Sequence, residues 1–119
     1  MQSISWNDVP EERMIQGIRR RIFTGESVML GRLFLPKGAL VPAHRHPNEQ
    51  ITHVLTGALR FVVDGTEVVV HAGEVLHIPS NAEHLAEALE DTDEIDAFSP
   101  IRTDWLDGSD AYLREGASR

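Results

Sequence analysis

The sequence predicts an all-β domain, a small antiparallel β-barrel or β-sandwich. Short segments of high β-propensity alternate with Gly, Pro, Asn and Asp residues, and no long stretch carries helical periodicity. The pair Asp64-Gly65 separates two such segments and suits the two-residue turn of a hairpin, because both turn residues need a positive φ. The 119 residues are enough for one core. Many short strands at this spacing are typical of a sandwich or barrel.

Nine segments are expected to be strands, and a turn-forming residue separates each from the next. In chain order they are 14–22, 28–35, 41–44, 50–56, 58–63, 66–71, 75–78, 85–89 and 94–98. The breaks between them fall, in the same order, at Gly25, Gly38, Pro47-Asn48, Gly57, Asp64-Gly65, Gly73, Pro79 and Asp91. Gly supplies a positive φ, Pro fixes its own φ, and Asn or Asp side chains bond to the nearby backbone, so each break ends a strand.

We expect one domain over residues 1–119, with looser structure at both ends. Residues 1–22 are predicted to form an N-terminal strand arm. Its apolar edge could pair with a second copy of the chain, so a homodimer is expected. The polar residues 107–119 are predicted to fray, although Tyr112-Leu113 could dock locally.

Three consecutive arginines in this arm raise the question of a nucleic-acid or phosphate site. On a strand, Arg19 and Arg21 face one side and Arg20 the other. The chain has 19 acidic and 11 basic residues and a net charge of −8, which argues against a nucleic-acid or anionic-membrane partner. The arginines are therefore interpreted as part of a solvated or interface-facing strand. An anionic substrate needs a local positive site.

The composition also favours a cytoplasmic protein. There is no cysteine, so disulfide and thiolate chemistry are excluded, and this fits a reducing compartment. Residues 1–6 lack a basic region followed by an apolar run, so no signal peptide is expected. No apolar stretch is long enough to cross a bilayer.

Two segments carry candidate metal ligands. His44 and His46 are one residue apart on an extended segment, so their imidazoles point the same way. Gln50 follows the Pro47-Asn48 break, where a returning strand can bring it to the same place. His84 follows a strand and a proline turn. Three imidazoles and one amide oxygen suit a divalent transition metal such as zinc, nickel, manganese or iron, and leave open positions for a substrate.

The amide ligand affects the chemistry of this predicted site. A carboxylate would cancel one of the two positive charges of the metal, an effect of roughly 4 kcal/mol at about 4 Å and an effective dielectric near 20. Gln50 leaves both charges, which favours an anionic, oxygen-rich ligand and Lewis-acid chemistry. Glu49 is the alternative ligand if the strand contains a bulge. His53 is predicted to face away from the site, and the orientation of His77 is left open.

A second group of candidates ends the last expected strand. Asp96 and Phe98 share one face, and the turn at Pro100 can bring Arg102 back over the end of the domain. An acid, a ring and a guanidinium could serve as a proton carrier, a sugar platform and a carboxylate clamp. From the residues alone, a solvated strand end is the other interpretation.

Both histidine segments resemble the paired motifs of the cupin superfamily. The first motif is matched by Gly38, His44, His46 and Gly57. Gln50 stands at its glutamate position, which favours Gln50 over Glu49 as the ligand. The second motif is matched by Gly73, Pro79 and His84. Asn81 replaces its glycine, since Asn tolerates a left-handed turn, and Ala88 replaces its final Asn.

The chain also resembles the small cupins of the KdgF family, from about Trp6 to Leu113. The segments that carry this resemblance are His44-Arg-His46-Pro-Asn-Glu-Gln50-Ile, Val54-Leu-Thr-Gly57 and Asp96-Ala-Phe98-Ser-Pro-Ile-Arg102. His53 departs from the family pattern, which has an aromatic residue there, and Ala58 departs after the loop glycine. These departures concern the substrate preference more than the reaction.

The resemblance implies a cupin fold, the double-stranded β-helix or jelly roll, and a metal-dependent enzyme. The implied reaction opens the ring of 4,5-unsaturated uronate monosaccharides from pectin or alginate breakdown and yields 4-deoxy-5-keto uronates. The implied metal ligands are His44, His46, Gln50 and His84. Asp96 is then the proton carrier, Arg102 the anion clamp and Phe98 the wall that packs on the sugar. A dioxygenase, another sugar isomerase and a non-catalytic binding module are the alternatives.

Overall fold

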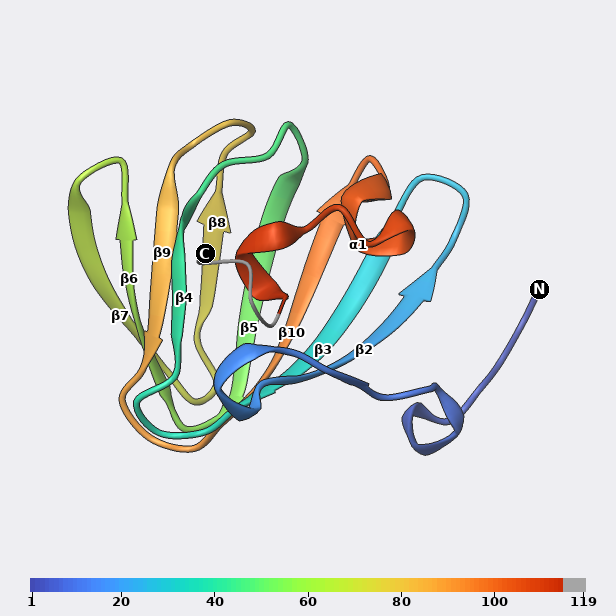
Figure 1. Cartoon of the computed structure of the whole chain (residues 1–119), viewed down its shortest axis with the longest axis horizontal. Helices are drawn as coiled ribbons and strands as arrows, with labels where there is room; N and C mark the ends of the chain where they lie inside the picture. The colour runs from blue at the N-terminus through green and yellow to red at the C-terminus, as the bar shows by residue number, and fades with distance from the viewer. Residues whose placement is uncertain (115–119) are drawn as a thin grey trace.

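Two antiparallel sheets face each other in the computed structural model, which describes residues 1–114 (Figure 1). The larger sheet has the strand order β1-β2-β3-β10-β5-β8, and the smaller has the order β4-β9-β6-β7. The strands are β1 (Glu12–Arg13), β2 (Arg19–Thr24), β3 (Met29–Leu35), β4 (Leu40–His44), β5 (Glu49–Thr56), β6 (Ala58–Val63), β7 (Thr66–His71), β8 (Val75–Ile78), β9 (His84–Ala88) and β10 (Thr92–Ser99). The helical elements are η1 (Trp6–Asp8), η2 (Ile15–Gly17), α1 (Thr103–Asp107) and η3 (Ala111–Leu113).

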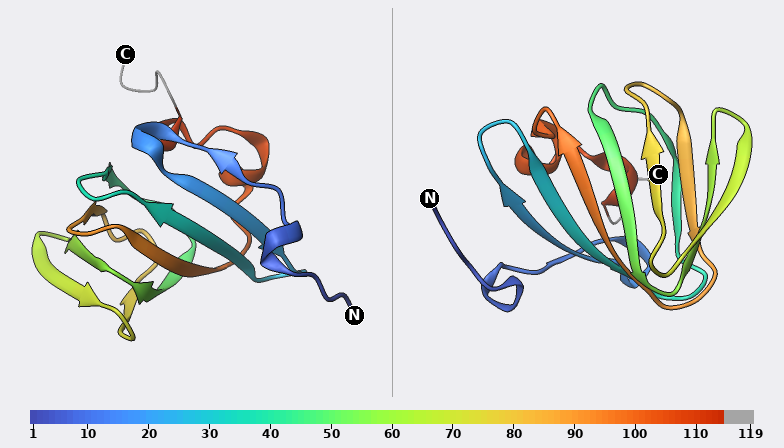
Figure 2. Two further views of the ribbon diagram at one scale, coloured as in Figure 1. Left: turned by 90° about the horizontal axis from the view of Figure 1, so that it is seen from below. Right: turned by 180° about the vertical axis from the view of Figure 1, so that it is seen from behind.

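The all-β prediction is confirmed, and within residues 1–114 the sheets form a sandwich, not a closed barrel. All nine predicted segments overlap observed strands. The sheets lie close together at one end and spread apart toward the other, and α1 and η3 lie between them (Figures 1 and 2). The predicted hairpin joins β6 to β7, where Asp64 has a φ of 46° and Gly65 a φ of 83°.

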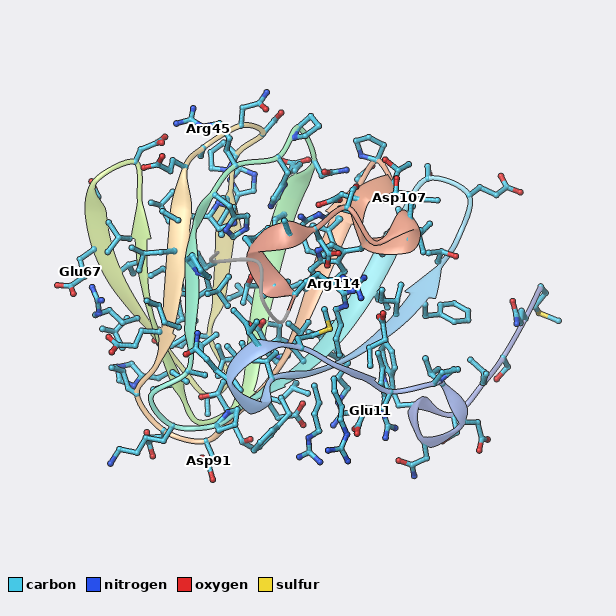
Figure 3. All side chains as sticks on the ribbon, in the orientation of Figure 1. Glu11, Arg45, Glu67, Asp91, Asp107 and Arg114 are labelled. Carbon is cyan, nitrogen blue, oxygen red and sulfur yellow. The ribbon has the colours of Figure 1, made fainter. Side chains whose placement is uncertain are left out.

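Side chains of the two inner faces fill the space between the sheets (Figure 3). Burial alternates along β3 and β10, so that every second residue is buried. This is the period of two that the alternating sequence pattern predicts for strands with one buried face. None of the helices in residues 1–114 is long and apolar enough to span a bilayer.

The N-terminal arm differs from the single strand expected over 14–22. Gln16 and Gly17 have φ values of 56° and 77° and interrupt the extended backbone, so β2 begins only at Arg19. The Gln16 side chain holds this bend against β4, because its Nε2 donates to the Leu40 carbonyl at 2.9 Å and its Oε1 accepts from the Leu40 amide at 2.8 Å. The interruption therefore depends on a tertiary contact.

The interpretation of the three arginines as part of a solvated or interface-facing strand is wrong for Arg20. It is 0% exposed, and its guanidinium lies 4.3 Å from the centre of the Trp105 ring. Its Nη1 donates to Asp110 Oδ2 at 2.7 Å, and its Nε donates to Glu12 Oε1 at 3.1 Å. Arg19, on the other face, is exposed. The alternation was predicted, but Arg20 faces the core and a buried carboxylate.

The C-terminal segment also differs from the expected frayed tail. Residues 107–109 are exposed, but the segment from Asp110 to Arg114 packs against the sandwich, and Asp110 and Leu113 are buried. Residues 115–119 of the predicted tail lie outside the described residues. The segment fits because Gly31 of β3 has no side chain: a β-carbon there would lie 2.6 Å from Trp105 Cζ3. Trp105 of α1 therefore rests directly on the inner face of the larger sheet.

Candidate metal centre

The structure brings the four predicted metal ligands together at the open end of the sandwich. His44 ends β4 and His84 begins β9, and the two residues are directly opposite each other in the smaller sheet. Gln50 lies on β5 of the larger sheet, and His46 lies in the loop that joins the sheets. One potential ligand nitrogen of each histidine lies within 4.8 Å of the other two. The site therefore joins both sheets.

Each of these imidazoles is oriented by a backbone carbonyl two residues away. The Nδ1 atoms of His44, His46 and His84 lie 2.8, 3.0 and 2.9 Å from the carbonyl oxygens of residues 42, 48 and 82. A carbonyl only accepts hydrogen bonds, so each Nδ1 carries the proton and donates. The Nε2 lone pairs are left free, which is the tautomer and orientation that a metal requires.

Gln50 also presents an acceptor to the same place. Its amide Nε2 donates to Thr52 Oγ1 at 2.9 Å, which points its Oε1 toward His46 Nε2 at 3.1 Å. Since His46 is protonated on Nδ1, two acceptors face each other here, and a cation between them would satisfy both. The donor set of three imidazole nitrogens and one amide oxygen fits a divalent transition metal.

The two questions about neighbouring residues have structural answers. Glu49, the alternative ligand, lies on the outer face of β5, where its Oε2 is 2.7 Å from His77 Nε2. His77 is exposed on the outer face of β8 and does not reach the cluster. His53 also faces outward, as the strand alternation predicts. Gln50 is therefore the residue of this pair that faces the histidines.

The three histidines are held in the neutral form that coordinates metals. Burial, aided by the charge of His84, lowers the pKa of His44 to about 3. Burial and the positive charge of Arg102 lower the pKa of His46 to about 4. Burial also lowers the pKa of His84. Neutral imidazoles are the ligand form, so this environment prepares the site for a cation.

Asp96 lies beside this cluster on the inner face of β10. It is 4% exposed and pairs with Thr52 across the sheet, whose Oγ1 donates to Asp96 Oδ1 at 2.6 Å. The Nε2 of Gln50 lies 3.5 Å from the same oxygen. Burial raises the pKa of Asp96, and the hydrogen bonds to it act in the opposite direction. A buried carboxyl group that holds or releases a proton is therefore adjacent to the histidines.

Phe98 and Arg102 lie on the same side of the cavity. Phe98 is buried and contacts the edge of His46, with ring centres 5.7 Å apart. Arg102 is buried above it, and its guanidinium carbon lies 5.0 Å from the centre of the Phe98 ring. The structure thus brings together all three predicted residues of the last strand and its turn, although Phe98 is a covered wall and not an open platform.

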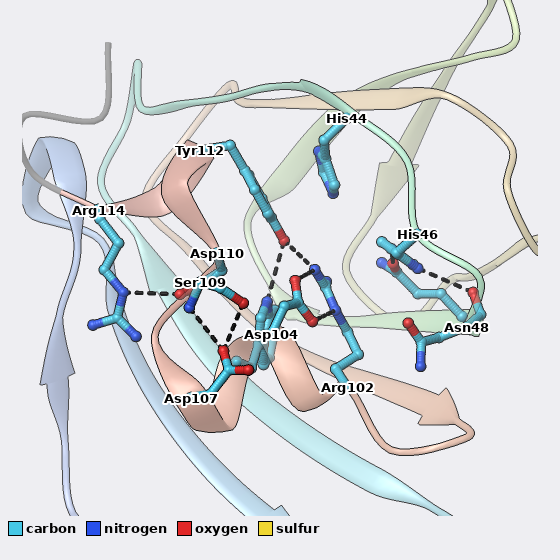
Figure 4. A network of polar contacts seen from close by, with 12 residues as sticks. His44, His46, Asn48, Arg102, Asp104, Asp107, Ser109, Asp110, Tyr112 and Arg114 are labelled. Carbon is cyan, nitrogen blue, oxygen red and sulfur yellow. Dashed lines mark hydrogen bonds and ion pairs between the residues drawn. The ribbon is translucent and has the colours of Figure 1, made fainter. Parts of the chain in front are cut away.

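Two residues that the sequence did not single out, Asp104 and Trp105, complete the site together with Tyr112 (Figure 4). Asp104 accepts from Arg102 Nε at 3.1 Å and from its Nη2 at 2.6 Å. The Tyr112 hydroxyl accepts from the same Nη2 at 2.6 Å and from Trp105 Nε1 at 3.1 Å. The Tyr112 ring stacks on His44, with centres 4.0 Å apart and planes 14° apart. The apolar pair Tyr112-Leu113 in a polar tail was the only signal for this contact.

The space enclosed by these residues is small. A cavity of about 30 Å³ lies between the sheets, lined by ligands, by Asp96 and by the C-terminal segment with Tyr112. This volume is close to the volume that one water molecule occupies in the liquid, about 30 Å³. A larger hollow of about 490 Å³ lies on the outer face of the larger sheet, where Arg21 and Arg32 are paired with Glu11 and Asp93. The histidine cluster lies elsewhere, so the small cavity is the candidate site.

The sandwich and its histidine cluster define a cupin, and a family model described as a cupin domain matches residues 31–96. The chain is 31% identical over 103 residues to the pectin degradation protein KdgF of Dickeya dadantii, an alignment that covers 84% of this chain and 94% of that protein. The protein therefore belongs to the KdgF family of small cupins.

Solved structures agree with this assignment. The structure of KdgF from Halomonas sp. matches with a TM-score of 0.78 and 30% identity, over 84% of this chain and 95% of that one. An RmlC-like cupin from Shewanella frigidimarina matches with a TM-score of 0.81 and 27% identity, over 88% of this chain and 96% of that one.

Proposed function

We propose that the protein is a metal-dependent enzyme that opens the ring of 4,5-unsaturated uronate monosaccharides to give 4-deoxy-5-keto uronates. One observation carries the proposal: a buried carboxyl group, Asp96, lines a cavity with His44, His84, Gln50 and a buried guanidinium, and His46 completes the cluster of histidines. Kinship with a pectin degradation protein supports the substrate class. The unsaturated sugars could come from pectin or from alginate, and both are substrates to test.

The reaction requires the transfer of one proton and the stabilisation of negative charge. The anomeric hydroxyl loses a proton as the C1–O5 bond breaks, which leaves an aldehyde at C1 and an enolate at C5. C4 then gains the proton, and the enolate becomes a ketone. Asp96 is the proposed carrier of this proton, because burial places its pKa above the usual range and Thr52 holds its orientation.

The negative charges of the substrate and of the developing enolate need positive partners. His44, His46, Gln50 and His84 would hold a divalent transition metal, whose Lewis acidity would stabilise the sugar carboxylate and the enolate oxygen. Arg102 is the proposed second anion partner. In the structure Asp104 and Tyr112 take its Nε and Nη2 groups, and Nη1 has no partner among the described residues, so a substrate carboxylate would bind Nη1 or replace one of these contacts. A sugar also needs more room than about 30 Å³, so the cavity would have to widen for it to bind.

The test follows the ultraviolet absorbance of an unsaturated uronate, which falls when its conjugated double bond is lost. Metal-loaded protein is expected to accelerate this loss over buffer and over metal-stripped protein. The variant Asp96→Asn should lose nearly all turnover and keep its metal content. Asp93→Asn is the matched control, because Asp93 lies on the same strand with its side chain on the outer face against Arg32.

Each result bears on a different part of the proposal. Unchanged turnover in Asp96→Asn would remove Asp96 from the mechanism. No acceleration by wild-type protein with nickel, zinc, manganese or iron would refute ring opening. Tight uronate binding in that case would point to a non-catalytic binding protein, and oxygen uptake with iron to a dioxygenase.

The proposal includes a cytoplasmic homodimer that acts on a small anionic sugar. What supports an interface is an apolar patch on the outer face of the larger sheet, where Val28, Ile51 and Val75 are exposed. Burying such a patch against a second copy would remove apolar surface from water. Sedimentation of the wild type and of Ile51→Glu tests this: the variant is expected to be monomeric, and a monomeric wild type would refute the dimer.

A further inference from the structure

Asn48 is a buried polar residue that the proposed function does not yet use. It is 4% exposed and lies in the loop between β4 and β5, two residues after His46 and two before Gln50. Its backbone carbonyl accepts from His46 Nδ1 at 3.0 Å (Figure 4). Its side chain contacts a different segment, because Nδ2 donates to the carbonyl oxygen of Pro100 at 2.6 Å. One residue therefore contacts two separate parts of the site.

Pro100 belongs to the turn that leads from β10 to Arg102. β10 ends immediately before Pro100, and Arg102 directly precedes α1. The Arg102 guanidinium lies 5.0 Å from the ring centre of Phe98, and the same ring lies 5.7 Å from that of His46. Among residues 1–114, the Asn48 amide makes the one side-chain hydrogen bond between this turn and the loop that carries His46. It is thus a direct link between the histidines and the guanidinium.

The loop is anchored separately on its other side, to the turn between β8 and β9. The Ser80 hydroxyl donates to the Pro47 carbonyl at 2.5 Å, and the Asn81 amide donates to the His46 carbonyl at 2.9 Å. These contacts and the Asn48 backbone hold His46 without any help from the Asn48 side chain. Loss of that side chain should therefore leave the histidine cluster in place and release only the turn before α1.

We propose that Asn48 is a positioning residue that fixes Arg102 relative to the metal centre, so that both act on one anionic substrate. This inference rests on the proposed ring opening. Arg102 and a bound divalent metal are both positive and repel each other. A uronate can contact both only if their separation matches the substrate. The hydrogen bond from Asn48 to Pro100 sets this separation from the side of the loop.

The first test replaces Asn48 by Leu, which is branched at the same carbon but carries no donor, and by Ala. In both variants KM for the unsaturated uronate should rise about tenfold, because binding by Arg102 is weakened. The kcat and the metal content should stay close to the wild-type values. Ser99→Ala is the matched control: Ser99 lies beside Pro100, and its hydroxyl donates at 3.1 Å to the carbonyl of Ser27, in the loop between β2 and β3. The control should leave KM unchanged.

The second test determines whether Asn48 acts through Arg102. Arg102→Met should raise KM by itself. Addition of Asn48→Leu should then change KM by less than about threefold, since the residue that Asn48 positions is already gone. Increases that multiply in the double variant, or an unchanged KM in both Asn48 variants, would overturn the proposal. Loss of metal from Asn48→Leu would also overturn it, because the side chain would then hold His46.

The third test observes Arg102 directly and needs neither metal nor turnover. Arg102 is buried and its Nε donates to Asp104 at 3.1 Å, so this N–H should give a separate signal in a proton–nitrogen NMR spectrum of the metal-free protein. The signal should shift or broaden in Asn48→Leu and stay in place in Ser99→Ala. An unchanged signal in Asn48→Leu would overturn the positioning role. A wild type without ring-opening activity would refute the proposed function, and this signal would still decide whether Asn48 positions Arg102.

Discussion

Replacement of Arg20 by Met tests how the N-terminal arm and the C-terminal segment hold each other over the site. Arg20 bridges β2 to Asp110 just before η3, and η3 carries Tyr112 onto His44. Both the Arg20 and Asp110 side chains are 0% exposed. Met fills the volume of the aliphatic stem but removes the charge. Asp110 then keeps only Arg114, whose Nε donates to it at 2.8 Å.

The size of the effect follows from this geometry. Removing one partner of a buried ion pair costs about 3–5 kcal/mol, and the remaining Arg114 contact favours the lower end, about 3 kcal/mol. Unfolding entropy is about 2.1 cal/mol/K per residue, so a chain of 119 residues has about 0.25 kcal/mol/K. The expected fall in Tm is the ratio of these values, about 12 °C.

Calorimetry of the metal-free variants measures this fall, with Arg19→Met as the control. Arg19 is the next residue on the same strand, is exposed, and makes no ion pair among residues 1–114. Its replacement should change stability by less than about 0.5 kcal/mol. A fall below about 3 °C in Arg20→Met, or equal falls in both variants, would refute the assignment of Arg20 as a buried link.

Three further predictions concern the turn, the protonation and the ligands of the site. Gly38→Ala should lower the free energy of unfolding by about 1–2 kcal/mol, because Gly38 has a positive φ. Gly57→Ala should lower it further, as urea denaturation would show, because Gly57 also has a positive φ and a β-carbon there would meet backbone atoms. The folded-state pKa of His46, about 4, lies below the unfolded value of about 6.5, so acid destabilises the metal-free protein below pH 6.5. At pH 5 this loss is about 2 kcal/mol and should be missing in His46→Gln, as chemical denaturation at pH 7 and pH 5 would show. His84→Ala should lose bound metal on dialysis, measured by elemental analysis, whereas the outward-facing His53→Ala should retain it.

Much of the candidate site was predictable because its chemistry is encoded at short range. Strand alternation predicted that His44 and His46 would converge, and they do, although β4 ends at His44 and His46 lies in the loop that follows. Asp96 and Phe98 share a face of β10, as the same alternation predicted. Gln50 was favoured over Glu49 by its place in the cupin motif, and the structure shows these two side chains on opposite faces of β5. Roles in catalysis remain predictions for these residues.

The remaining parts of the site depend on contacts between distant segments. Glu94 resembles an ordinary strand residue until its burial beside Asp96 is known. Arg20 resembles a surface cation in the sequence. Its partner Asp110 lies 90 residues further along the chain, so only the folded structure shows that the two form a buried ion pair. Trp105 of α1 can pack over the cavity only because Gly31 of β3 has no side chain, and these two residues are far apart in the sequence. Local propensity carries no information on such pairs.

The sequence by itself determined the all-β class, most of the strand segments, the hairpin at Asp64-Gly65 and the residues that converge on the candidate metal centre. These features follow from a period of two and from turn chemistry, which act over a few residues. The tertiary structure alone decided that the sheets form a sandwich, that Glu94 is buried, and that Tyr112 covers His44. The reason is physical: burial, and the pKa changes and ion pairs that it causes, depend on which distant segments exclude water from one another.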